Sequence, residues 1–202
     1  MKKVIISPPF SNIVPVFKNV DTIIGTYTLK KRKGRHRVLS TLKKTKKGWI
    51  NNVGLRNPGI KSLKKKGTAI SISIQETKDW SEIFEILENK TRKLKIKAIE
   101  FNISCPNAKV TNIDSKIINQ ARLLFDTIIL KLPHNCDTNL IDQYIKLNVD
   151  YLHVSNTKKI QKGALSGQDL ISSNLETIKY IKKNYDQKVI AGGGIYSFED
   201  FI

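Results

Sequence analysis

The chain alternates short β-branched runs with longer segments of helical periodicity, and this alternation restricts its fold more than any other feature. Seven runs rich in Val, Ile and Thr are predicted strands: residues 4–7, 22–28, 69–74, 98–104, 127–132, 151–156 and 189–192. Apolar residues recur at helical spacing between the later runs, in residues 80–93, 114–125, 138–147 and 173–185. Because strands that alternate with helices build parallel sheets, we expect an α/β fold.

Polar residues recur at the carboxyl ends of the predicted strands. They are Ser7, Thr26, Asn102, Lys131, Asn156 and Gly193. Such ends form the active face of a β/α barrel, whereas an open doubly wound sheet concentrates its site at one switch point. The even spread therefore favours a TIM-type (β/α)8 barrel. A barrel of this kind usually has about 250 residues. The chain has 202, so we expect a single domain over residues 1–202 that lacks the eighth strand and the final helix.

Composition limits the cellular setting and the class of partner. A hydrophobic content of 40% suits one globular domain, and no apolar run near the N-terminus is long enough for a signal or a membrane span. Two cysteines without a secretion signal indicate a reduced, cytoplasmic protein. The net charge of +19 comes largely from lysine clusters in the first third of the chain. Nucleic acid would fit this charge, but we favour a solvated lysine-rich surface.

The segment 101–107, Phe-Asn-Ile-Ser-Cys-Pro-Asn, is the strongest candidate for chemistry. It joins a thiol, a hydroxyl and two carboxamides directly after a predicted strand. Pro106 fixes its own φ angle and disfavours helical geometry at Cys105, so the thiol is held at the strand end. This arrangement suits a positioned acid or base.

Six segments together resemble the dihydroorotate dehydrogenase family in order and spacing. They are residues 48–60, 101–107, 130–133, 153–157, 163–167 and 191–195. Cysteine at position 105 is similar to the soluble class of that family, whose base is a cysteine. The resemblance implies an FMN enzyme of pyrimidine biosynthesis that oxidises dihydroorotate to orotate. Cys105 would remove a proton from the substrate ring while hydride passes to flavin N5.

The resemblance also implies which residues bind substrate and cofactor, and it implies no metal. The residues matched to substrate binding are Asn51, Asn102, Asn107, Asn156 and Thr157. Carboxamides suit a ring with carbonyl and N–H groups because each offers a donor and an acceptor. The residues matched to FMN are Ser7, Thr26, Asn102, Lys131, Ser166, Gly167, Gly193 and Gly194. Cys136 matches no motif and is expected to be a surface or packing residue.

The chain departs from the family pattern at Gly25, where the family usually has a lysine that contacts flavin and substrate. Three interpretations stay open. The first is a truncated or diverged dihydroorotate dehydrogenase. The second is a flavin barrel that acts on RNA like tRNA-dihydrouridine synthase, for which the Cys-Pro pair after a strand and the basic charge speak. The third is a non-catalytic paralogue, for which Gly25 and the missing eighth strand speak. The resemblance implies a homodimer or an electron-transfer partner subunit, without membrane or nucleic acid. It leaves open whether fumarate or NAD receives the electrons.

Overall fold

The computed structural model describes residues 4–15, 19–33, 41–46, 48–52, 54–74, 76–103, 113–154, 157–161 and 163–195. The chain divides into two compact units. The first contains Met1–Lys33 and Leu55–Ile129, and the second contains Gly34–Gly54 and Leu130–Ile202. The boundary at Ile129 falls within strand β7 (Thr127–Lys131).

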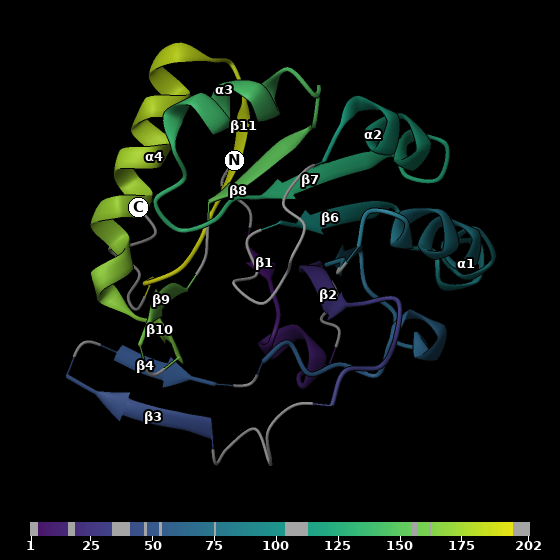
Figure 1. Ribbon diagram of the computed structural model, residues 1–202, viewed down its shortest axis with the longest axis horizontal. Helices are drawn as coiled ribbons and strands as arrows, with labels where there is room; N and C mark the ends of the chain where they lie inside the picture. Colours follow the sequence, from purple (N-terminus) through teal and green to yellow (C-terminus); the bar gives the residue numbers. More distant parts are fainter. Residues whose placement is uncertain are drawn as a thin grey trace. The chain divides into compact units, whose positions relative to one another are not determined.

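Seven of the described strands form a parallel sheet in the order β1-β2-β5-β6-β7-β8-β11, so that each strand neighbours the next one along the chain (Figure 1). Their bounds are Ile5–Ile6, Asp21–Tyr27, Ala69–Ile72, Ala98–Asn102, Thr127–Lys131, Tyr151–Val154 and Lys188–Ala191. All seven match predicted runs. A doubly wound sheet would reverse its strand order at a switch point, whereas a barrel keeps it sequential. The predicted fold class, an α/β fold consistent with an incomplete TIM-type barrel, is confirmed.

In the first unit, β5 and β6 pair in parallel with Ser71 opposite Glu100. Alternate residues of a strand point to opposite faces of the sheet. Phe101 packs edge-on against Trp80 of helix α1 (Asp79–Leu94), with 4.8 Å between ring centroids. The face that carries Phe101 is therefore covered by α1, and Glu100 and Asn102 lie on the other face.

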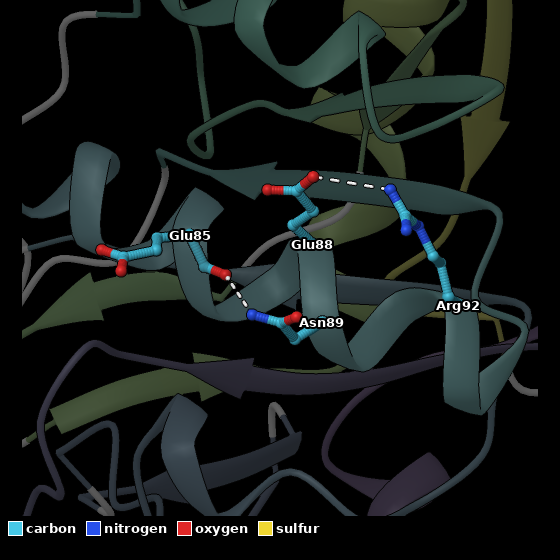
Figure 2. Close-up of polar contacts among 4 residues, drawn as sticks. All are labelled: Glu85, Glu88, Asn89 and Arg92. Atoms are coloured by element: carbon cyan, nitrogen blue, oxygen red, sulfur yellow. Dashed lines mark hydrogen bonds and ion pairs between the residues drawn. The ribbon is translucent and has the colours of Figure 1, made fainter.

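Helix α1 is amphipathic, as its sequence predicts. Its buried residues follow helical spacing: Trp80, Ile83, Phe84, Leu87 and Thr91. Its exposed face carries weak polar contacts (Figure 2), including an ion pair at 3.5 Å between Arg92 and Glu88, one turn apart. Such exposed pairs contribute little to stability. The second helix of this unit, α2 (Ser115–Arg122), starts where the Asp114 side chain accepts a hydrogen bond from the Ile117 amide at 2.9 Å.

In the second unit, helix α4 (Ile171–Asn184) packs against β8 and β11, which pair in parallel (Figure 1). Helix α3 (Thr138–Ile145) begins at Asp137, whose side chain accepts a hydrogen bond from the Asn139 amide at 2.8 Å. The four predicted helices are thus confirmed, with ends that shift by up to a few residues.

The second unit also contains an antiparallel sheet that the sequence analysis did not predict. Its strand order is β3-β4-β10-β9 (Figure 1). The bounds are Leu42–Thr45, Gly48–Asn51, Gly163–Ser166 and Lys158–Ile160. Short strands with exposed lysines gave no clear alternation of apolar and polar residues. Three described 3-10 turns complete the elements: η1 (Phe10–Asn12), η3 (Ile60–Ser62) and η4 (Gln168–Leu170).

Candidate active site

Three predicted site residues, Cys105, Asn107 and Asn156, lie outside the described residues. Their predicted roles as base and substrate ligands stay predictions. The other predicted residues are described, some in each unit.

The first unit brings together Thr26 of β2 and Asn102 of β6, two strands that lie on either side of β5. Asn102 Nδ2 donates a hydrogen bond to Thr26 Oγ1 at 3.0 Å. Both side chains are partly exposed. Ser7 follows β1 and is also partly exposed, and its carbonyl accepts a hydrogen bond from the Ser11 amide at 3.2 Å. Thr26 and Asn102 therefore lie side by side, and their assignment to FMN stays a prediction.

Two residues that the sequence analysis missed extend this pair into the core. Thr26 Oγ1 lies 3.1 Å from Ser71 Oγ, and Ser71 Oγ donates to Glu100 Oε1 at 2.6 Å. Ser71 and Glu100 are each 0% exposed. A carboxylate is costly to bury without hydrogen bonds, so a buried glutamate in a strand is a signal of function or polar structure. The acidic residue within the apolar run 98–103 could have been recognised from sequence.

Gly25 occupies a conformation that a side chain would disturb. Its φ angle is +123°, and a Cβ atom there would lie 2.5 Å from the Ser71 carbonyl oxygen. The Asn12 side chain binds both backbone polar groups of Gly25: Oδ1 accepts from the Gly25 amide at 2.9 Å, and Nδ2 donates to the Gly25 carbonyl. The absence of the family lysine is thus accompanied by a local backbone arrangement that suits glycine.

The second unit brings two of the predicted glycine segments together where helix α4 begins. A Cβ atom at Gly194 would lie 2.9 Å from the Gly167 carbonyl oxygen and 2.7 Å from Ile171 Cγ1. Asn174 of α4 donates to the carbonyls of Gly192 and Gly193, at 2.8 and 3.3 Å, and is buried. The loop after β11 is therefore held against the start of η4 and α4. The two glycine segments thus approach so closely that no side chain fits at position 194.

Asn51 and Ser166 lie on neighbouring strands of the antiparallel sheet. Asn51 is opposite Ala164, and its Nδ2 donates to the Ala164 carbonyl at 3.3 Å. Ser166 is opposite Trp49 and donates to the Trp49 carbonyl at 3.2 Å. The Asn51 side chain thus uses one of its N–H donors within the antiparallel sheet, and this hydrogen bond fixes the position of the side chain.

Lys131 ends β7 and is 9% exposed, which is unusual for a lysine. The next residue, Leu132, donates its amide to the His153 carbonyl of β8 at 3.0 Å. Thr157 is partly exposed and directly precedes β9. A buried cation at a strand end is consistent with the flavin-contacting role that the resemblance implies.

Cys136 has the properties of a packing residue. It is a free cysteine in a partly buried position. Burial, together with the nearby Asp137 carboxylate, raises the pKa of its thiol to about 12. The thiol is therefore protonated at neutral pH, so Cys136 is a poor nucleophile or base.

Within the described ranges, no three or more His, Cys, Asp or Glu side chains lie close enough to hold a metal ion. No helix in the same part of the chain is both long enough and apolar enough to cross a membrane.

Comparison with curated proteins finds similar chains that share one name, dihydroorotate dehydrogenase B (NAD(+)), catalytic subunit. The protein from Saccharolobus solfataricus is 25% identical over 179 residues, which cover 76% of this chain and 60% of the relative. Those from Bacteroides thetaiotaomicron and Petrotoga mobilis are 23% and 27% identical, and each match covers 96% of this chain and 74% of the relative. No protein-family model matches the chain.

These matches extend over most of the chain and establish a distant homology. The chain spans about 60% of the length of the Saccharolobus relative and 74% of the other two. The resemblance predicted from six sequence segments is therefore confirmed at the level of the family.

Proposed function

Because the chain is a distant homologue of dihydroorotate dehydrogenase B catalytic subunits, we propose that it is an FMN-dependent oxidoreductase that oxidises dihydroorotate to orotate in pyrimidine biosynthesis. The observation that carries this proposal is the approach of Gly167 and Gly194 at the start of η4 and α4. Glycine at both positions would permit the FMN phosphate to approach the backbone closely.

The residues of the second unit suit the rest of the cofactor. Backbone groups of residues 166–167 and 193–194 would hold the FMN phosphate, with Asn174 fixing the second of these loops. Lys131 would place its cation near the flavin ring, where positive charge stabilises a reduced flavin. Bound FMN would supply the hydride acceptor. In the first unit, Ser7 and Thr26 would add contacts to the cofactor.

We propose that Cys105 removes the proton from the substrate ring and that asparagines hold the ring. The asparagines and the threonine assigned to the substrate are Asn51, Asn102, Asn107, Asn156 and Thr157. A thiolate near neutral pH requires a nearby positive charge. The single domain over residues 1–202 and a cytoplasmic location remain part of this proposal.

The relatives are named as NAD(+)-linked catalytic subunits, which supports a further part of the proposal. We assign NAD as the final acceptor, reached through a separate electron-transfer subunit. A homodimer of catalytic chains would be compatible with this assembly.

The proposal is tested by mixing the FMN-loaded full chain with dihydroorotate under anaerobic conditions and following the flavin absorbance. We expect the visible flavin band to bleach. Cys105→Ala should retain FMN and slow the bleaching by at least about 100-fold, the usual contribution of a general base. Cys136→Ala is the matched control and should bleach like the unchanged chain.

Two results would overturn the proposal. One is a chain that binds no FMN, since the reaction needs a hydride acceptor. The other is equal bleaching rates for the unchanged chain and Cys105→Ala, which would remove Cys105 from the chemistry.

A further inference from the structure

Three lysines line a cavity of about 350 Å³ in the first unit: Lys30, Lys31 and Lys61. The first two lie just after β2, and Lys61 belongs to η3. All three are exposed. The volume of the cavity falls within the range of about 300–1,000 Å³ that is typical of small-molecule sites. The proposed oxidation of dihydroorotate uses none of these residues.

A buried asparagine, Asn57, holds the backbone of the two segments that carry the lysines. Its side-chain Oδ1 accepts hydrogen bonds from the amides of Thr28 and Gly59, at 3.1 and 2.9 Å. Its own backbone exchanges two hydrogen bonds with Arg32, at 2.9 and 3.3 Å. The two segments are therefore fixed beside each other before any ligand binds.

Gly59 sets how closely these segments approach. Its φ angle is +82°, and a Cβ atom there would lie 2.7 Å from the Lys31 amide nitrogen and 3.0 Å from the Lys30 carbonyl carbon. Because the backbone fixes where the lysine side chains begin, the segments cannot separate to relieve the repulsion between their ammonium groups. An anion bound among the ammonium groups would relieve it.

The charges around the cavity favour a ligand with more than one negative charge. Glu82 of α1 also lines the cavity, and its carboxylate pairs with Lys61 at 2.9 Å. Within the part of the chain that the structure describes, neither Lys30 nor Lys31 has an ion-pair partner. Since an exposed ion pair is weak, Lys61 can also turn to a more highly charged anion. Lysine binds phosphate oxygens as a point charge.

We propose that this cavity binds the diphosphate group of a small molecule through the ammonium groups of Lys30, Lys31 and Lys61. Inorganic pyrophosphate and a nucleoside diphosphate share this chemistry. Leu29 also lines the cavity and offers an apolar contact that only an organic ligand would use. The proposal is independent of the proposed function, because none of these residues is assigned to FMN or to dihydroorotate.

Calorimetric titration of the full chain with pyrophosphate tests the proposal. We expect one pyrophosphate per chain. Lys31→Gln and Lys61→Gln should each weaken binding by about tenfold, because each removes a hydrogen bond to a charged group. Glu82→Gln should instead strengthen binding by a few fold, since it frees Lys61 and removes a negative charge from the cavity.

Lys93→Gln is the matched control, because it removes the same charge near the other end of α1, about 16 Å along the helix axis from Glu82. It should leave the affinity for pyrophosphate unchanged. A second titration uses adenosine diphosphate. Tighter binding than that of pyrophosphate identifies an organic diphosphate as the ligand, whereas equal or weaker binding identifies the diphosphate group alone.

Three results would overturn the proposal. The first is an absence of pyrophosphate binding. The second is equal weakening in Lys31→Gln and Lys93→Gln, or tighter binding of single-stranded RNA that is weakened equally in both, which would indicate a general basic surface. The third is binding that responds to Gly194→Ala and not to Lys31→Gln, which would place pyrophosphate at the proposed FMN phosphate surface.

Discussion

Gly25 shows how a single residue can fix a local backbone. Alanine there would bring a Cβ atom within 2.5 Å of the Ser71 carbonyl, at a φ angle of +123° that L-residues rarely adopt. We expect Gly25→Ala to lower the free energy of unfolding by about 2–4 kcal/mol, from strain and overpacking together. Urea denaturation followed by circular dichroism measures the loss.

Gly54→Ala is the control, because Gly54 also has a positive φ of +70° but has nothing within 4 Å of its Cβ position. Equal losses in the two variants would contradict the role of the Ser71 contact.

Helices α3 and α4 are joined by two tyrosines that share one carboxylate. The hydroxyls of Tyr180 and Tyr185 each donate to Asp142 Oδ1 at 2.8 Å. The hydrogen bond to Asp142, with burial and its negative charge, raises the pKa of Tyr185 from 10.0 to about 12. A raised pKa in the folded state means that the stabilisation is complete below pH 10 and is lost as the pH rises toward 12. The stability difference between the unchanged chain and Tyr185→Phe should therefore be constant up to about pH 9.5 and then shrink.

Urea denaturation at several pH values measures this difference. In an Asp142→Asn background, the largest cause of the pKa shift is absent, so the effect of Tyr185→Phe should change less with pH in this range. A difference that grows with rising pH would contradict the assignment.

At the scale of the whole molecule, FMN is expected to act as a stabilising ligand. A ligand that binds only the folded state adds about 2.7 kcal/mol at 100 times its dissociation constant. For a chain of this size, that raises the melting temperature by about 5–10 °C.

Gly194→Ala should reduce this rise, because its Cβ would meet the Gly167 carbonyl and Ile171 in the proposed phosphate surface. Thermal denaturation over a range of FMN concentrations measures the effect, with Gly54→Ala as control. An identical FMN response in the unchanged chain and Gly194→Ala would place the phosphate elsewhere.

The strands and helices of the parallel sheet were predictable because each has a strong local pattern. β-branched runs such as 69–74 and 127–132 are buried almost throughout, and α1 buries residues at regular helical spacing. The antiparallel sheet was not predictable on the same basis. Its strands have only three or four residues, and the sheet depends on the pairing of β4 with β10, which lie far apart in the chain, so local sequence does not reveal it.

Residues of the candidate site that lie within a family motif could be predicted from the sequence. Residues that only the tertiary structure connects to the site could not. The glycines at 167 and 194 were chosen by motif, and the structure brings them together. The link from Asn102 to Glu100 depends on the cross-strand register of Ser71, which the sequence does not specify. The one feature of the local sequence that indicated this link was an acidic residue, Glu100, within an apolar strand.

The pairing of Asn12 with Gly25 has a consequence for how this lineage could change. The Asn12 amide occupies the amide and carbonyl of Gly25, and any side chain at position 25 would collide with a neighbouring strand. The lysine that the family resemblance implies at this position would thus meet a backbone that does not accept it. A Gly25→Lys variant would need compensating changes in the segment that carries Asn12.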